Sequence, residues 1–218
     1  MINMIDERLK SLTKYVNRND KIIDIGCDHA LLDIYLVKNN IVNKVIVSDV
    51  SKNALMQGIN NINKYNLSDK IYARCGSGLE VLNSNDDIDT VIISGMGSNT
   101  IIDILNNKCL NKINKLIIQS NKDYYLLRKE IIKLGFIIDK EEVIIVNNKL
   151  YINIVFVRGY KEYSLEELKY GSINMINREL YYNYLIIKYD SILMKVNNEK
   201  QKEINIEKGI LTRYFDKE

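Results

Sequence analysis

Cysteine, histidine and proline are scarce in this 218-residue chain, which has three cysteines, one histidine and no proline. Cys27, Cys75 and Cys109 are widely separated, so with a single histidine they cannot form the usual clustered zinc site, and we predict reduced thiols and no metal. No apolar run approaches the roughly 20 residues of a membrane helix, which predicts a protein that does not span a membrane. The absence of proline accompanies abundant isoleucine, asparagine and lysine, and we read it as compositional bias.

The size and charge of the chain set broad limits on its class. A chain of 218 residues can hold one full-sized domain and an appendage, and 46% hydrophobic with 27% charged residues is typical of a soluble globular protein. The N-terminal "MINMIDERLKSLTKYV" predicts an amphipathic helix instead of a signal peptide, hence a cytoplasmic protein. A net charge of +3 permits an RNA partner through a local patch but does not require one.

Short runs rich in valine and isoleucine alternate with stretches of helical period, as in a parallel sheet covered on both faces. The predicted strands are 21–25, 44–49, 71–74, 90–94 and 115–119. The predicted helices between them lie near 31–38, 53–65, 99–106 and 124–134. With right-handed crossovers, this order predicts a doubly wound α/β (Rossmann-like) sheet.

The pattern changes at Phe136, where "FIIDKEEVIIV" and "KLYINIVFVR" are joined by Asn147 and Asn148. Asparagine tolerates the left-handed geometry of a tight hairpin, so an antiparallel strand pair is expected to end the sheet. Methyltransferases that use S-adenosylmethionine share this order, whereas nicotinamide-dependent dehydrogenases end with a further parallel strand. The comparison favours a class I methyltransferase without deciding it, because fold does not fix function.

From Ser164 onward the sequence is helical, and "SLEE" fits a capping box in which Glu167 reaches back to Ser164. We therefore expect a methyltransferase domain over residues 1–160 and a helical domain over 161–218. Two helices are predicted to pack as an antiparallel, coiled-coil-like hairpin. The predicted packing stripe consists of Leu180, Tyr184, Ile187, Ile192 and Val196.

The segment "DIGCDHA" carries one glycine, Gly26, after the first predicted strand. A dinucleotide pyrophosphate calls for three glycines, and Asp28 would repel a phosphate. A ligand with a sulfonium and an ammonium group but no phosphate suits Asp24, Asp28 and His29, and S-adenosylmethionine fits that description. The alternative is that Asp28 only caps the helix and His29 is an interior residue.

Three further loops are expected at the same edge of the sheet. Asp49 lies 23 residues beyond Gly26, where a carboxylate accepts hydrogen bonds from the ribose hydroxyls of adenosine. "CGSGLEVL" and "ISGMGSNTII" follow the third and fourth strands, although each alone could be an ordinary strand-to-helix turn. The expected cofactor-binding residues are Asp24, Gly26, Asp28, His29, Asp49, Val50, Gly76, Ser77, Gly78, Ser94, Gly95 and Met96.

Six segments together resemble the bacterial tRNA (adenine-N1)-methyltransferases of the TrmK family, which modify the adenosine at position 22 in the D-arm region. They are "RLKSLTKYV", "DIGCDHA", "GSGLEVL", "SGMGSNTIIDIL", "QSN" and "KLYINIVF". The resemblance is close over residues 5–160 and looser over the tail, which matches that family's coiled-coil domain. It implies an enzyme that uses S-adenosylmethionine and a tRNA partner. One departure is Ser77, where the family usually has an aspartate that contacts the cofactor's adenine amino group; a hydroxyl accepts that bond more weakly.

Methyl transfer to adenine N1 depends mainly on positioning and needs neither a metal nor a covalent enzyme intermediate. We expect Gln119 and Asn121, at the end of the fifth strand, to hold the target adenine by its edge. Because N1 is hidden in a base pair, the base must be unpaired or turned out, and Tyr151 is the candidate to stack on it. Tyr151 as an ordinary half-buried strand residue is an equal alternative.

The tail and the substrate leave further alternatives open. The helices could clamp tRNA, form a dimer contact or be a solvated hairpin. The candidates for phosphate contacts are Lys188, Lys195, Lys200 and Lys202. The substrate could instead be another RNA or a small molecule, or the chain could be a non-catalytic homologue, for which Ser77 is the warning. The sequence leaves the oligomeric state open, a monomer included.

Overall fold

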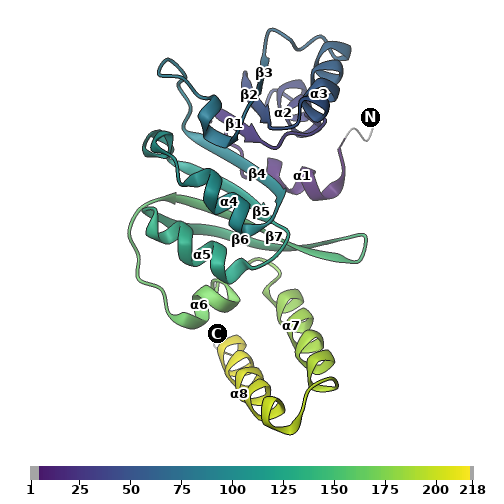
Figure 1. Ribbon diagram of the computed structural model, residues 1–218, viewed down its shortest axis with the longest axis vertical. Coiled ribbons are helices and arrows are strands. Elements are labelled where there is room, and N and C mark those ends of the chain that lie inside the picture. The colour runs from purple at the N-terminus through teal and green to yellow at the C-terminus, as the bar shows by residue number, and fades with distance from the viewer. Residues whose placement is uncertain (1–4, 217–218) are drawn as a thin grey trace.

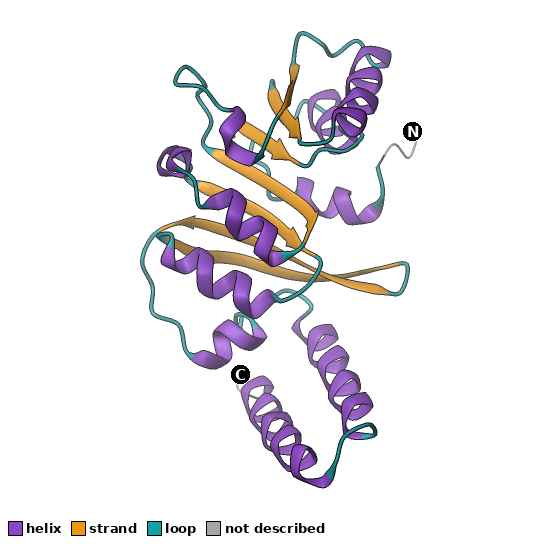
Figure 2. Ribbon diagram, viewed as in Figure 1, coloured by secondary structure: helices purple, strands orange, loops and turns teal. Residues whose placement is uncertain are grey.

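The computed structural model describes residues 5–216 and shows one seven-stranded sheet with helices on both faces (Figure 1, Figure 2). The strands are β1 (Ile22–Ile25), β2 (Val45–Asp49), β3 (Ile71–Cys75), β4 (Thr90–Met96), β5 (Lys115–Ser120), β6 (Phe136–Val146) and β7 (Lys149–Arg158). Their order is β3-β2-β1-β4-β5-β7-β6. The first five are parallel, and β7 runs antiparallel to both β5 and β6, which confirms the doubly wound sheet and its closing hairpin.

Helices follow the strands as the sequence predicts. Those of the sheet region are α1 (Glu7–Thr13), α2 (Leu31–Lys38), α3 (Lys52–Lys64), α4 (Ser98–Leu105) and α5 (Tyr124–Lys133), with 3-10 turns η1 (Gly78–Val81) and η2 (Lys108–Lys112). The C-terminal part contains α6 (Leu165–Tyr170), α7 (Arg178–Leu193) and α8 (Asn198–Phe215). The capping box of Ser164 and Glu167 at the start of α6 is confirmed.

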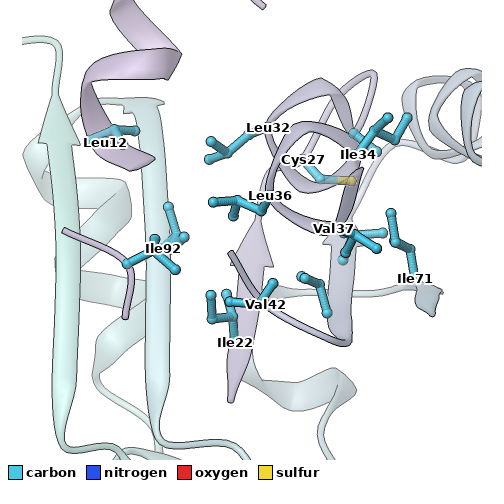
Figure 3. Packing of buried hydrophobic residues seen from close by; sticks show 14 of the residues in the cluster. Leu12, Ile22, Cys27, Leu32, Ile34, Leu36, Val37, Val42, Ile71 and Ile92 are labelled. Atoms are coloured by element: carbon cyan, nitrogen blue, oxygen red, sulfur yellow. The ribbon is translucent and has the colours of Figure 1, made fainter. Parts of the chain in front are cut away.

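The central strands are buried on both faces, which explains their nearly continuous apolar sequences. Successive side chains of a strand point to opposite faces, so Ile22 and Ile92 join one core cluster while Ile23 joins the other. Helices α1 and α2 cover the first face, where Leu12, Leu32 and neighbouring apolar residues surround Ile22 and Ile92 (Figure 3). Helices α4 and α5 cover the second face.

A fully buried ion pair ties the C-terminal helices to the sheet. Arg128 Nε on α5 donates to Glu141 Oε1 on β6 over 2.7 Å, and neither side chain is exposed. The backbone carbonyl of Leu168 accepts from Arg128, while the amide of Ser172 donates to Glu141. The segment around α6 is therefore held by both members of the pair. Helices α7 and α8 extend beyond it as a hairpin (Figure 1).

The predicted packing stripe on α7 is wrong in its first half. Leu180, Tyr184 and Ile187 are exposed at 39%, 44% and 69%. The opposite side of α7 packs instead, through Tyr182, Ile186 and Tyr189 among others, against Leu211 and Tyr214 of α8. Helix α7 is apolar on several sides, so its periodicity could not identify the side that faces α8.

Candidate cofactor and substrate site

A cavity of about 370 Å³ lies at the carboxyl ends of β1, β2 and β4, within the size range of small-molecule sites. Open α/β sheets bind ligands at this edge. The predicted residues that line it are Asp24, Gly26, Asp28, His29, Asp49, Ser94, Gly95 and Met96. Sequence reasoning missed Arg8, Leu9, Cys27, Leu31 and Leu32, which also line it.

The loop between β1 and α2 has a constrained backbone. Gly26 has a φ of 77°, a conformation that favours glycine, and a Cβ there would lie 2.1 Å from Met96 Cε, so that side chain would have to move. Asp28 and Ala30 also have positive φ angles, 48° and 53°. Such outliers in non-glycine residues cluster at ligand sites, where surrounding contacts stabilise them. Here the amides of Gly26 and Cys27 donate to the carbonyl of Ser48 over 2.8 and 3.1 Å.

Acidic and imidazole groups lie at the mouth of the cavity. Asp49 Oδ1 accepts from the amide of Ser51 over 2.8 Å, and Asp49 Oδ2 accepts from the amide of Asp28 over 3.4 Å. His29 Nε2 is 3.6 Å from Asp28 Oδ2, and both side chains are exposed. The alternative of an interior His29 is therefore wrong, as is the alternative of Asp28 as a helix cap, because α2 begins after Ala30 with no side-chain cap. The adjacent Val50 is 70% exposed and outside the cavity lining.

The loop after β3 lies beside the cavity and does not line it. The amide of Gly76 donates to the carbonyl of Asp49 over 3.1 Å, which keeps this loop next to the end of β2. Gly78 has a φ of 50°, and a Cβ there would be 2.9 Å from Ile104. Ser77 precedes η1 and is exposed. Three of the four predicted loops thus meet around the cavity, and the fourth lies next to the end of β2 outside the lining.

Two carboxyl groups are buried together, Asp24 in the cavity lining and Asp33 outside it. Asp24 on β1 is 4% exposed, and burial raises its pKa to about 7 despite a hydrogen bond with Asp33 that lowers it. Asp33 on α2 is fully buried, and burial followed by the charge of Asp24 raises its pKa well above the usual range. Among the described residues no N–H or O–H group donates to either oxygen of Asp33. A protonated Asp33 that donates to Asp24 explains both observations.

Arg8 connects the cavity to a chain of hydrogen bonds between α1 and the sheet. Its Nη1 donates to Gln119 Oε1 over 2.9 Å, and Gln119 Nε2 donates to Asn153 Oδ1 over 2.5 Å. Asn153 Nδ2 then donates to Ser11 Oγ on α1 over 2.8 Å. Gln119 is only 1% exposed and both ends of its amide are bonded, so it lies behind the cavity wall, where it orients Arg8.

The other two target-base candidates lie close to the cavity. Asn121 is exposed, and its Nδ2 donates over 2.5 Å to the carbonyl of Gly95, a residue of the cavity lining. The half-buried Tyr151 ring has the Arg8 guanidinium 5.8 Å from its centroid and the Lys149 ammonium 5.1 Å from it. Arg8 therefore separates the cofactor cavity from the Tyr151 ring. The segment "RLKSLTKYV" contains Arg8 but gives it no role, because only the packing of α1 brings it to the cavity.

The three cysteines are unpaired, and burial raises the pKa of the Cys27 thiol. Over residues 5–216, histidine, cysteine and acidic side chains form no group of three or more that could hold a metal ion. In the same part of the chain, every helix is too short or too polar to cross a bilayer.

Comparisons with known proteins agree with this architecture. A family model described as a methyltransferase domain matches residues 5–154. The Mycoplasma genitalium protein named tRNA methyltransferase MG248 is 30% identical over 202 residues, which cover 90% of this chain and 89% of that protein. The Bacillus subtilis tRNA (adenine(22)-N(1))-methyltransferase is 27% identical over 161 residues, 72% of this chain and 67% of that protein. The structure of M. capricolum TrmK with S-adenosylhomocysteine has a TM-score of 0.87, 33% identity and 98% coverage of both chains.

Strand order and the position of the cavity thus define a class I methyltransferase. Within that class the chain belongs to the TrmK family of bacterial tRNA methyltransferases. The family, the fold class and the enzyme class expected from the sequence motifs are confirmed.

Proposed function

We propose that this protein transfers a methyl group from S-adenosylmethionine to N1 of the adenosine at position 22 of tRNA. The observation that carries the proposal is the acid-lined cavity at the carboxyl ends of β1, β2 and β4, with Asn121 and Tyr151 beside it. The reaction named for the B. subtilis relative supplies the substrate atom.

The residues present fit the cofactor. Bound S-adenosylmethionine supplies an electrophilic methyl group on a sulfonium, and no phosphate that Asp28 would repel. Asp49 would accept from the ribose hydroxyls, and Asp28 would place negative charge near the cationic end, with Asp24 in the cavity lining below. Arg8 is the one lysine or arginine of the lining and would pair with the carboxylate of the methionyl part. Ser77 lies outside the lining, on the loop that the Gly76 amide holds next to the end of β2.

The chain's own groups act chiefly by positioning. Asn121 would hold the edge of a turned-out adenine, and Tyr151 would stack on its face, with the Arg8 guanidinium on the cofactor side. We assign Gln119 a positioning role, since its amide is occupied by Arg8 and Asn153. An amide and an aromatic face tolerate the positive charge that develops on the methylated base better than a second cation would.

We further propose that residues 1–160 form the catalytic domain, that 161–218 form a helical unit for RNA, and that the protein works in the cytoplasm. The test of the main proposal is incubation of purified protein with labelled S-adenosylmethionine and a tRNA transcript, followed by mapping of the modified nucleoside. We expect N1-methyladenosine at position 22 and no transfer to a transcript with guanosine there. Transfer to both transcripts would show that the target is not N1 of the adenosine at position 22.

A further inference from the structure

A second cavity lies between the catalytic sheet and the helical extension. It has a volume of about 400 Å³ and is formed by the start of α5, the turn between β6 and β7, and α7. We call it the junction groove. Its charged and exposed aromatic lining consists of Lys122, Asp123, Lys149, Tyr184 and Lys188.

The junction groove carries excess positive charge. Lys122, Lys149 and Lys188 are exposed and form no ion pair within residues 5–216, whereas Asp123 is the one acid of the lining. The Asp123 carboxylate accepts from the amide of Leu126 as the cap of α5, over 3.3 Å. By contrast, a larger cavity of about 790 Å³ at the amino ends of the strands has three acids, Asp20, Asp86 and Asp87, beside its four cations, and Lys21 and Arg74 pair with Asp87 and Asp86. Unpaired cations favour a polyanionic occupant.

An aromatic platform lies in the same groove. The ring of Tyr184 stacks on that of Tyr181 with centroids 6.4 Å apart and an angle of 12° between planes. Tyr181 is buried and makes an edge contact with Tyr124 of α5, so the pair is fixed to the catalytic sheet. Tyr184 remains 44% exposed. Exposed aromatic rings beside lysines are the arrangement that binds unpaired nucleotides, because every base has a face that can stack.

The junction groove is continuous with the catalytic site. Asn121 lines the groove and donates to the carbonyl of Gly95, which lines the cofactor cavity. Lys149 lines the groove and lies 5.1 Å from the centroid of the Tyr151 ring. An RNA strand that follows the groove would therefore pass the place where the target base would be held.

We propose that the junction groove binds the backbone of tRNA next to the target nucleotide, with Lys122, Lys149 and Lys188 as phosphate contacts and Tyr184 as a stacking surface for a neighbouring unpaired base. This inference rests on the proposed function and extends it to the substrate surface. It differs from the phosphate contacts expected along the tail, since of those lysines only Lys188 lies in the groove.

The test compares the double variant Lys122→Gln/Lys188→Gln with the control Lys64→Gln/Lys70→Gln, which removes two exposed lysines of the α3 region with no ion pair among the described residues. Lys149 is retained because it contacts Tyr151. Affinity for a tRNA transcript is measured between 50 and 200 mM salt. We expect the groove variant to lose roughly tenfold or more in affinity and its salt slope to fall by about 1.5 to 2, with the control unchanged. Affinity for S-adenosylmethionine should be unchanged in both.

Tyr184→Ala should weaken tRNA binding by about 5- to 150-fold, and Tyr184→Phe should retain it. Wild-type affinity and salt slope in the double variant would overturn the proposal and favour an acidic protein as the occupant. Methylation of the transcript by the wild-type protein is measured alongside. Its absence would refute the proposed function, whereas normal methylation with unchanged groove variants would refute only this inference.

Discussion

The buried carboxyl pair predicts a specific dependence of stability on pH, which Asp33→Asn should alter. Both side chains ionise near pH 4 when the chain is unfolded. In the folded protein burial raises the pKa of Asp24 to about 7 and raises the pKa of Asp33 well above its usual range. The stability that these protons confer is complete below pH 4 and is lost as the pH rises through the raised pKa of each group, about 7 for Asp24.

The magnitude follows from counting protons. Between pH 5 and 6.5 folding takes up about two protons at this pair, and each lowers the free energy of unfolding by about 1.4 kcal/mol per pH unit. Asparagine has nearly the same shape, donates to Asp24 through its amide and takes up no proton, so about one proton remains. Between pH 5 and 6.5 the free energy of unfolding of Asp33→Asn should therefore rise by about 2 kcal/mol relative to that of the wild type.

The assay is urea unfolding at constant ionic strength and closely spaced pH values from 5 to 6.5. The quantity of interest is the difference in free energy of unfolding between variant and wild type, in which other titrating groups cancel. Asp103→Asn removes an exposed carboxylate of α4 and serves as the control. A difference for Asp33→Asn that stays constant with pH would refute the assignment of a proton to Asp33.

Three further predictions concern the cofactor, the ion pair and the target base. Asp49→Ala should weaken S-adenosylmethionine binding by about tenfold or more in calorimetry, because it removes a charged acceptor, and unchanged affinity would exclude the ribose contact. Arg128→Met should lower the free energy of unfolding by about 3–5 kcal/mol, since it leaves Glu141 buried and unpaired. The double variant Arg128→Met/Glu141→Leu should recover most of that loss, because no buried charge remains. A double variant no more stable than the single variant would contradict this explanation. Tyr151→Phe should retain methyl transfer while Tyr151→Ala loses about 5- to 150-fold, and equal rates in all three proteins would remove Tyr151 from the site.

Local patterns in the sequence were sufficient for the central part of the fold. The apolar runs of β1, β2 and β4 are buried on both faces, so neighbouring positions such as Ile22 and Ile23 are both apolar and the strands are recognisable. The turn that contains Gly26 was also predictable, because a glycine directly after an apolar strand favours the positive φ that the backbone has there. On α7 the same reasoning failed, since apolar residues occur on several sides and only the position of α8 decides which are covered.

The sequence by itself determined the succession of strands and helices along the chain, the closing hairpin and the acidic loops at the carboxyl edge, because each depends on residue types close together in the chain. Only the tertiary structure decided that Arg8 enters the cavity, that Gln119 lies behind it and that Asp33 shares its burial with Asp24. These relations join residues far apart or on different elements, and no local pattern encodes them. Hydrogen bonding and burial across packed elements, such as that between α1 and β5, determine which polar groups face the ligand.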